Sequence, residues 1–287
     1  YCVVPYVRGR ERSRNKENIL EEVAALASDG CREITLLGQN VNSYGKDLYD
    51  DYDFADLLSD ICKIDGDFTV RFMTSHPKDA SHKLIDTIAD NPKIAKAFHL
   101  PVQSGSNDVL RAMNRHYTRE AYLELVDYMR KRIPDIALTT DIIVGFPGET
   151  DADFEDTLDI LRKVRYDNIY SFIFSPRKGT KAADMEQLPE SVRAARFERL
   201  LALQNEISND KNRSYLHTCQ HVLVEGKSKT DESKLTGRNE KNRLVHFEGD
   251  DSLIGGYADV YITRAETYAL YGELKNRDEG EQNSGNN

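Results

Sequence analysis

Apolar positions follow two periods over the first part of the chain. Between residues 15 and 213, short apolar runs alternate with longer segments in which apolar residues recur every three or four positions. The short runs predict strands and the longer segments predict amphipathic helices. We expect strands at 33–37, 69–73, 97–102, 138–145 and 169–174, and helices at 16–27, 54–62, 83–89, 119–131 and 152–164. This alternation predicts an α/β fold with a parallel sheet covered by helices. A sixth strand before Cys2 would complete the repeat.

The pattern changes near Leu216, after a long helix expected at 190–213. Beyond it, short β-branched and aromatic runs are separated by Gly, Asp, Ser and Asn, which predicts a small antiparallel β-barrel. Its strands are expected at 220–225, 243–247, 257–262 and 268–273. The last residues have almost no apolar content, so we expect disorder there. The resulting division is 1–214, 215–276 and a tail at 277–287.

Composition narrows the class of protein. The 287 residues carry a formal charge of -10, which argues against a generally basic nucleic-acid binder. No apolar run approaches the roughly 18 residues that cross a bilayer, so no membrane is expected. The four cysteines at 2, 31, 62 and 219 form no close pair, which disfavours a zinc ribbon and favours a reducing, cytoplasmic location. Cys31, Cys62 and Cys219 are interpreted as small buried hydrophobes.

Polar residues follow each expected strand of the larger domain. Catalytic groups of strand–helix barrels lie where the strands end, because the loops converge there. The same residue types also stop strands and cap helices. Thr150 and Ser106 are therefore interpreted as caps, and His99 as a hydrogen-bonded core residue rather than a metal ligand. The strand ends carry Gln39 and Asn40, Ser75, Gln103 and Ser104, the segment 145–150, and Arg177.

Charged residues suggest two further features. Arg8, Arg10, Arg12 and Arg14 alternate, so they would line one side of an extended segment and suit phosphates. A solvated charged loop is the alternative interpretation. Acidic residues between 47 and 53 lack the spacing of a calcium loop, and a solvated loop is expected there.

Six strings carry a family resemblance when taken in order. They are CVVPY at 2–6, LGQNVN at 37–42, TSHP at 74–77, HLPVQSGS at 99–106, GFPGET at 145–150, and SFIFSPR at 171–177. Together they resemble the MiaB family of tRNA methylthiotransferases along nearly the whole chain, to about Leu274. Related enzymes acting on threonylcarbamoyladenosine in tRNA or on a ribosomal protein differ in three of these strings, which makes MiaB the closer resemblance.

The resemblance implies a radical S-adenosylmethionine (SAM) partial (β/α)6 barrel, lacking its first strand in this chain, followed by a tRNA-binding TRAM barrel. It implies that a methylthio group is added to carbon 2 of an N6-isopentenyladenosine beside the anticodon of tRNA. The implied cofactors are SAM, a 4Fe-4S cluster that reduces it, and a second 4Fe-4S cluster that supplies sulfur. An electron donor such as flavodoxin or ferredoxin is also implied.

The resemblance assigns roles to individual residues. Cys2 matches the third of three cluster-binding cysteines, and the other two would lie three and seven residues before it. The segment 141–149 resembles a motif that supports the SAM adenine, with Asp141 departing from the pattern and Gly145 matching it. Gln39, Asn40, Ser75, Gln103 and Ser104 become candidates for SAM or substrate contacts, and Arg177 for a carboxylate or phosphate. The TRAM-like string at 235–238 lies among candidate phosphate contacts at Lys227, Lys229, Lys234, Arg238, Lys241 and Arg243.

Two other classes of function stay open on the residues alone. A strand–helix barrel hydrolase or isomerase without a cluster would fit, because no complete cysteine motif is present in the chain. A non-catalytic RNA-binding protein would also fit, because the small barrel and the arginine segment would suffice. Within the resemblance, a methylthiotransferase acting on threonylcarbamoyladenosine or on a ribosomal protein is the alternative.

Overall fold

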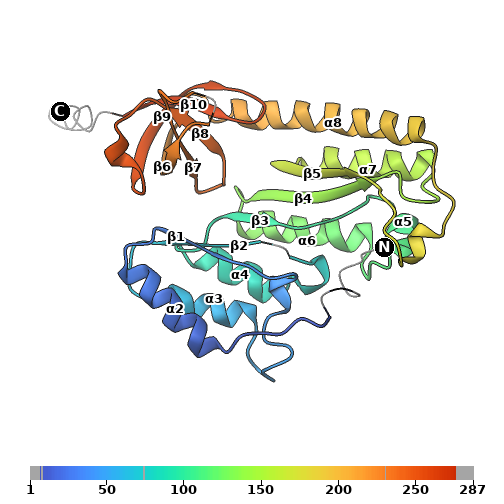
Figure 1. Ribbon diagram of the computed structural model, residues 1–287, viewed down its shortest axis with the longest axis horizontal. Helices are drawn as coiled ribbons and strands as arrows, with labels where there is room; N and C mark the ends of the chain where they lie inside the picture. The colour runs from blue at the N-terminus through green and yellow to red at the C-terminus, as the bar shows by residue number, and fades with distance from the viewer. Residues whose placement is uncertain (1–6, 8, 74, 230, 276–287) are drawn as a thin grey trace. The chain divides into compact units, whose positions relative to one another are not determined.

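The chain divides into two compact units, Tyr1–Ile207 and Ser208–Asn287. A computed structural model describes residues 7, 9–73, 75–229 and 231–275 (Figure 1). The boundary between the units lies inside the long helix α8 (Glu190–Arg213), whereas the sequence pattern predicts it just after that helix. The expected tail at 277–287 lies outside the described residues. No helix in the described ranges combines the length and the apolarity that a membrane span requires.

The first unit alternates helices and strands as the periodicity predicts. Its strands are β1 (Glu33–Leu36), β2 (Thr69–Phe72), β3 (Ala97–His99), β4 (Ala137–Val144) and β5 (Asn168–Ile173). Its helices are α2 (Lys16–Ser28), α3 (Phe54–Cys62), α4 (His82–Asp90), α5 (Asn107–Ala112), α6 (Arg119–Arg132) and α7 (Asp151–Val164), with α8 following. Short 3-10 turns, η1 (Val41–Ser43), η2 (Pro77–Asp79) and η3 (Lys181–Ala183), follow β1, β2 and β5. The pattern predicted only a capped turn where α5 lies.

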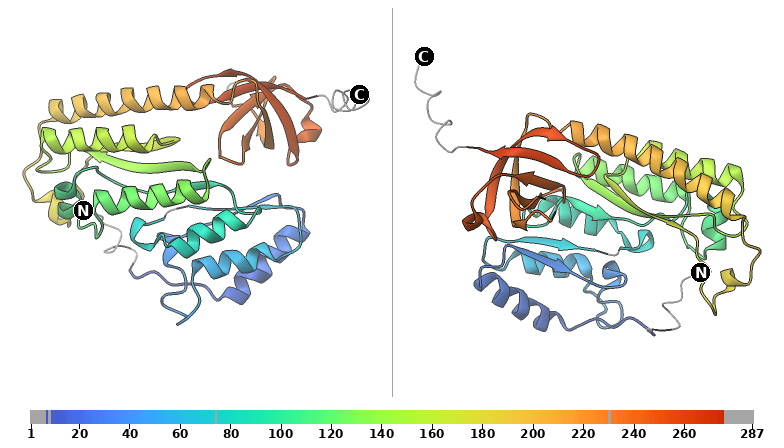
Figure 2. Two further views of the ribbon diagram at one scale, coloured as in Figure 1. Left: turned by 180° about the vertical axis from the view of Figure 1, so that it is seen from behind. Right: turned by 45° about the horizontal axis from the view of Figure 1, so that its top comes forward.

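The five strands run parallel and neighbour one another in chain order. β1 pairs with β2, and β3, β4 and β5 form a second ladder. An isolated bridge connects Val70 of β2 to Ile94, which lies just before β3. A second bridge joins Gln103 to Ile142 beyond the end of β3, which is shorter than predicted. The strands therefore end on a common side, as expected of a partial barrel (Figures 1 and 2).

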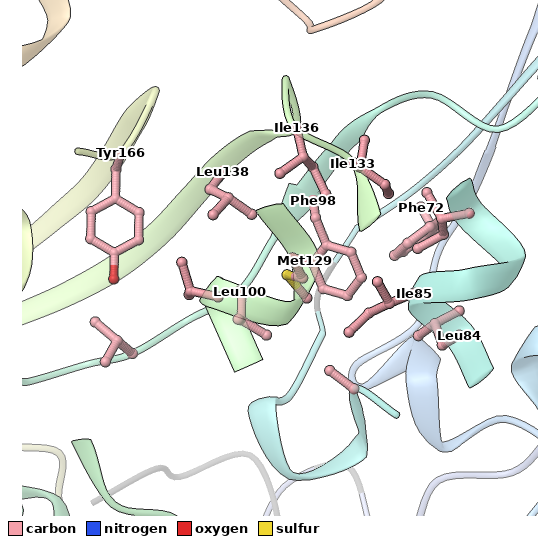
Figure 3. Close-up of a cluster of buried hydrophobic side chains, with 14 of the residues drawn as sticks. Phe72, Leu84, Ile85, Phe98, Leu100, Met129, Ile133, Ile136, Leu138 and Tyr166 are labelled. Carbon is pink, nitrogen blue, oxygen red and sulfur yellow. The ribbon is translucent and has the colours of Figure 1, made fainter. Parts of the chain in front are cut away.

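Alternating side chains give the strands one buried and one open face. On β4, Thr140 and Ile142 are buried, whereas Thr139 and Asp141 are partly exposed. The buried positions join a core with the helices, in which Phe72 and Phe98 pack edge to face at 5.2 Å (Figure 3). Burial of this kind contributes about 25 cal/mol per Å² of apolar surface. The open face, on the opposite side, carries the side chains considered below.

The second unit contains a closed five-stranded barrel. Its strands are β6 (Cys219–Lys227), β7 (Leu235–Asn239), β8 (Leu244–Phe247), β9 (Tyr257–Ala265) and β10 (Leu270–Leu274), in the order β10-β8-β7-β6-β9. The predicted barrel is confirmed, but it is not wholly antiparallel, because β10 and β8 run parallel. η4 (Asp251–Leu253) precedes β9.

The sequence pattern missed β7, because residues 235–238 contain the glycine typical of a turn. In the strand, a Cβ at Gly237 would lie 2.7 Å from Val222 Cγ1 and closer still to the Leu223 carbonyl oxygen. Glycine is thus needed for the close approach of β6 and β7. The residue type that suggested a turn is what allows the strands to pair.

Candidate functional site

The loops that follow β1 and β2 are tied together by a half-buried carboxylate. Asn40 Nδ2 donates to Asp79 Oδ2 at 2.6 Å, and the Lys46 ammonium pairs with the other oxygen. Burial alone would raise the pKa of Asp79, but these two hydrogen bonds hold it below its ordinary value. The carboxylate is therefore ionised at neutral pH and fixes the two strand ends relative to each other.

Four buried polar atoms in these two loops have no hydrogen-bond partner among the described residues. They are Asn40 Oδ1, both amide atoms of Asn42, and Ser75 Oγ. Asn42 and Ser75 are each only 5% exposed. Leaving such a group unpaired costs about 1–3 kcal/mol, and native proteins almost always pair them. Their concentration at two strand ends indicates a place where a polar ligand completes the hydrogen bonds.

Asn42 is a candidate site residue that sequence reasoning did not single out. It lies in the string at 37–42, two positions after Asn40, and begins no helix that it could cap. A polar side chain in that string is indistinguishable from an ordinary loop residue until its burial is known. Only the lack of partners for both its amide oxygen and its amide nitrogen marks it.

The arginine segment is held against the loop after β1. Ser13 N donates to Asp47 Oδ2 at 3.0 Å, Gly45 N donates to Ser13 Oγ at 3.0 Å, and the Tyr44 hydroxyl donates to the Arg14 carbonyl at 2.8 Å. Asp47 is exposed, as expected of a solvated loop, and it also anchors this segment. Asp53 in the same stretch caps α3. These contacts place the residues after position 8 beside the end of β1.

A cavity of about 340 Å³ lies between this segment and the end of β1. Arg10, Arg12, Gln39 and Asn40 are among its lining residues. Arg14 also reaches it, but its guanidinium pairs with Glu22 at 2.7 Å. The structure thus brings two predicted basic residues to two predicted SAM contacts. Cys2 and Arg8 lie outside the described residues.

The loop after β3 uses its polar groups differently. Ser104 is fully buried, and its hydroxyl contacts Thr157 Oγ1 at 3.3 Å and accepts from Ser106 N at 3.2 Å. Gly105 N donates to Thr157 Oγ1 at 2.9 Å. Ser106 caps α5, as predicted. The side chain of Ser104 therefore fastens the loop to α7 and is not aimed at a ligand.

Gln103 is held in an unusual backbone conformation. Its φ of 69° lies in the left-handed region, which costs a non-glycine residue about 1 kcal/mol or more. The strain is sustained because Gln103 N donates to the Asp141 carbonyl at 2.9 Å and Ile143 N donates to the Gln103 carbonyl at 2.9 Å. Strained residues cluster at functional sites, so Gln103 remains a candidate contact for SAM or substrate.

On the open face, His99 and Asp141 lie side by side. His99 Nε2 is 3.5 Å from Asp141 Oδ1, and His99 Nδ1 is 2.9 Å from Thr139 Oγ1. The ring of Tyr170 meets the histidine edge-on at 5.5 Å. His99 is hydrogen-bonded, as predicted, but it is half-buried rather than part of the core. It also faces the open side beside a predicted site residue, which the strand register could have revealed, because His99 pairs with Thr139 two positions before Asp141.

The segment after β4 is built around Gly145. Its φ is 72°, and a Cβ there would lie 2.5 Å from Arg193 Cγ. Gly145 N donates to Glu149 Oε2 at 2.8 Å, and the same oxygen accepts from Arg196 Nη1 at 2.8 Å. The predicted capping box at Thr150 is confirmed. This loop is therefore packed tightly against α8.

Arg177 is not brought to the other candidates by any described contact. It is exposed in the loop after β5, where its carbonyl, rather than its guanidinium, accepts from Thr180. Its guanidinium can therefore reach toward solvent.

Metal ligands do not gather in the part of the chain that the structure describes. No group of three His, Cys, Asp or Glu side chains there could hold a metal ion. Cys31 and Cys62 are half-buried free thiols, and burial raises the pKa of Cys62. Cys219 is exposed rather than buried, contrary to expectation, because it begins β6 with its side chain outward. Three cluster ligands cannot come from these residues.

Most of the predicted phosphate contacts in the second unit are already engaged. Lys227 pairs with Asp251 at 2.9 Å, Lys234 with Asp231 at 2.8 Å, and Arg238 with Glu225 at 3.1 Å. Arg243 is buried beside the Tyr215 ring, so it is not on the surface of the barrel. Lys229 is exposed. A phosphate would have to compete with carboxylates for three of these cations.

Sequence profiles of known families match both units. The radical SAM superfamily profile matches residues 1–161, which is more than half of the chain. The chain belongs to the radical SAM superfamily. A TRAM domain profile matches residues 213–275 and covers the five-stranded barrel. Membership implies SAM and a 4Fe-4S cluster as cofactors. The unpaired atoms after β1 and β2 suit a polar ligand such as SAM, whereas the described residues offer no ligand set for the cluster.

Close relatives share one name. The radical SAM chain is 58% identical over 275 residues to the tRNA-2-methylthio-N(6)-dimethylallyladenosine synthase of Alkaliphilus oremlandii, covering 96% of this chain and 58% of that protein. It is 55% identical to the synthase of the same name from Carboxydothermus hydrogenoformans, covering 96% and 62%. The chain thus spans about three-fifths of the length of these relatives.

A solved structure supports the fold alone. Coproporphyrinogen III oxidase from Escherichia coli, a radical SAM enzyme, superposes with a TM-score of 0.51 at 13% identity. The match covers 86% of this chain and 60% of that one.

Proposed function

We propose that this chain is the SAM-binding barrel and TRAM portion of a tRNA methylthiotransferase. The reaction adds a methylthio group to carbon 2 of N6-isopentenyladenosine beside the anticodon. The identity of 55–58% to synthases of that name, along 96% of the chain, carries the proposal. The proposed parts are the barrel at 1–214, the TRAM barrel at 215–276 and a disordered tail at 277–287.

SAM binds, in this proposal, where the strands of the first unit end. Asn40, Asn42 and Ser75 supply hydrogen bonds to its amino-acid and ribose groups, because their buried polar atoms are otherwise unpaired. SAM held there would supply, once an electron from the cluster cleaves its sulfur–C5′ bond, a 5′-deoxyadenosyl radical able to remove hydrogen from the unactivated base carbon. The remaining proposed contacts are Gln39, Gln103, Asp141, Gly145 and Arg177, with Ser104 positioning the loop that carries Gln103.

Other components of the reaction come from outside the described residues. Cys2 is proposed as one of three thiolate ligands of the SAM-binding 4Fe-4S cluster. Such a cluster leaves one iron open for SAM. A second 4Fe-4S cluster would supply the sulfur, and flavodoxin or ferredoxin would supply electrons.

The tRNA is proposed to contact both basic regions. Arg10 and Arg12 line the cavity beside Gln39, which suits a phosphate next to the reacting nucleoside. Arg8, Arg14, Lys227, Lys229, Lys234 and Arg238 complete the proposed RNA-binding set, from which Arg243 is left out because it is buried. The unpaired thiols of Cys31, Cys62 and Cys219 suit a reducing compartment, and we propose the cytoplasm.

Nucleoside mass spectrometry tests the proposal. tRNA from cells lacking the gene should lose 2-methylthio-N6-isopentenyladenosine and accumulate its N6-isopentenyl precursor. The complete gene should restore the modification, whereas the Cys2→Ala gene should not. Unchanged methylthio nucleosides in the deletion strain would refute the assignment.

A biochemical experiment separates this enzyme from a barrel without a cluster. The product of the complete gene is reconstituted anaerobically with iron and sulfide, and reductive cleavage of SAM is measured. We expect bound iron and 5′-deoxyadenosine from the wild type and none of the latter from Cys2→Ala. A colourless wild-type protein that leaves SAM intact would exclude radical SAM chemistry.

A further inference from the structure

Four side chains form a lateral row across the outside of the small barrel. Thr236 of β7 is the direct partner of His246 of β8, His246 is the partner of Tyr271 of β10, and Tyr271 is the partner of Arg264 of β9. Residues paired in register point to the same face of a sheet. Their chain neighbours Leu235, Val245 and Leu270 are buried in the barrel, so the row faces outward.

Three of these groups are planar and already stacked. The rings of His246 and Tyr271 lie 5.3 Å apart at 29°, and the Arg264 guanidinium lies 3.8 Å from the Tyr271 ring centre. The Tyr271 ring is held between His246 and Arg264, so these side chains lose little rotamer freedom when a further planar group stacks on them. The column is therefore preorganised for stacking.

A hollow of about 380 Å³ opens beside the column, a size that suits a single nucleobase with part of its sugar. Lys234 lines the hollow at the column and so do Glu248 and Glu273. This mixture disfavours a simple anion site, because two carboxylates would repel an anion. It suits a planar group that bears amino donors for the carboxylates and is linked to a phosphate near the lysine.

One member of the row has a charged partner outside it, because the Arg264 guanidinium pairs with the Glu266 carboxylate. Thr236 Oγ1 and His246 Nδ1 are buried and find no partner among the described residues. Burial and the nearby Lys234 ammonium lower the pKa of His246 below its ordinary value of 6.5. The ring is therefore neutral at pH 7 and stacks without repelling the Arg264 charge.

We propose that the column of His246, Tyr271 and Arg264 is a stacking platform for an unpaired nucleobase of RNA, with Lys234 beside the adjoining phosphate. Stacking on aromatic side chains contributes strongly to single-strand binding and tolerates any base. Stacking suits this barrel, because Lys227, Lys234 and Arg238 are each paired with a carboxylate in the free protein. On binding, Lys234 would exchange the Asp231 carboxylate for the phosphate. The identification of tRNA as the natural ligand rests on the proposed function.

Substitution of Tyr271 tests the platform in the full chain. Binding of a fluorescein-labelled single-stranded RNA octamer is measured by anisotropy. Tyr271→Leu should raise Kd about tenfold, whereas Tyr271→Phe should stay within about twofold because it keeps the ring. His246→Leu provides a second variant in case the first fails to fold, as judged by circular dichroism.

A matched control exists on another part of the barrel. His221 and Tyr257 also stack, at 4.5 Å and 16°, but Asp259 holds the histidine at 2.8 Å. Tyr257→Leu should leave Kd within about twofold, because the Asp259 carboxylate beside that pair would repel the phosphates of an RNA strand. Equal losses in Tyr271→Leu and Tyr257→Leu, or no loss in folded Tyr271→Leu and His246→Leu, would overturn the platform.

Salt dependence and tRNA analysis separate this inference from the proposed function. Lys234→Gln should reduce the slope of log Kd against log salt by about one, and Tyr271→Leu should leave the slope unchanged. If the gene is needed for methylthiolation but Tyr271→Leu binds RNA like the wild type, the platform alone is wrong. If RNA binding follows the stacking variants but deletion leaves methylthiolation intact, the proposed function alone is wrong.

Discussion

The loops after β1 and β2 and the loop after β3 contain the same kinds of polar residue and use them in opposite ways. Asn40, Asn42 and Ser75 keep buried polar atoms without partners, whereas Ser104 and Thr157 satisfy each other and the neighbouring backbone. The first pair of loops retains hydrogen-bonding capacity for a ligand. The loop after β3 uses its hydroxyl groups to hold α5 and α7 in place. Position at a strand end therefore does not by itself identify a ligand contact. What identifies one is a buried donor or acceptor that has no hydrogen-bond partner within the protein.

The largest loss of stability is expected from a substitution in the loop after β3. In Gly105→Ala the new Cβ would lie 2.6 Å from Thr157 Cα and closer still to the Asp156 carbonyl oxygen. Backbone on both sides must move, so we expect a loss of unfolding free energy of about 3 kcal/mol or more in urea titrations. Gly148→Ala is the control, because its φ is 82° but nothing lies within 4 Å, which should cost only about 1 kcal/mol. Equal losses would show that the loop is not packed as described.

A smaller loss is expected when the hydroxyl network of that loop is removed. Thr157→Val deletes the acceptor of Gly105 N at 2.9 Å and leaves a buried amide unpaired. We expect a destabilisation of about 1–2 kcal/mol by urea unfolding. Thr150→Ser, which keeps a capping hydroxyl on α7, should change stability by less than about 0.5 kcal/mol. An unchanged unfolding free energy in Thr157→Val would mean that the hydroxyl groups of Ser104 and Thr157 are not needed to hold the loop and are free to bind a ligand.

The tie between the two ligand-facing loops should depend on pH. The pKa of Asp79 lies below its ordinary value of 3.8, so its ionisation stabilises the fold above that pH and the contribution disappears as pH falls through the folded pKa. Asp79→Asn should lower stability at pH 7 by about 1 kcal/mol, since Lys46 is exposed and screened. The difference from the wild type should narrow below about pH 4. Thermal unfolding from pH 3 to 7 measures it, and a difference that widens toward acid would contradict the assignment.

The smallest effect on stability is expected at Asn42. Asn42→Leu removes two polar atoms that have no partner in the described residues, so the free protein should be as stable as the wild type or slightly more stable. Differential scanning calorimetry measures this. A loss above about 1.5 kcal/mol would indicate that Asn42 is satisfied within the folded chain.

Much of the first unit could be predicted because its elements are long and periodic. α3 and α8 have the predicted bounds, and the five strands lie where apolar runs predicted them. β7 could not be predicted, because the close approach at Gly237 requires a residue typical of turns. α5 was missed because a helix of six residues carries too little periodicity.

The candidate site was predictable only in outline. Strand ends indicated where it lies, but nothing in the sequence distinguishes Asn42, whose amide is unpaired, from Ser104, whose hydroxyl is engaged. Likewise, Asp47 looks like one of several loop carboxylates until its contact with Ser13 is known. These distinctions depend on partners far apart in the chain, which local patterns do not encode.

SAM affinity measured side by side in three proteins tests the central claim most directly. The wild type, Asn42→Leu and Ser104→Ala, each expressed from the complete gene and reconstituted with iron and sulfide, are titrated with SAM by isothermal calorimetry. We predict that Asn42→Leu weakens binding about tenfold or more, while Ser104→Ala stays within about threefold of the wild type. Unchanged affinity in Asn42→Leu, or an equal loss in both variants, would contradict the claim that the unpaired atoms after β1 and β2 are the ones that bind SAM.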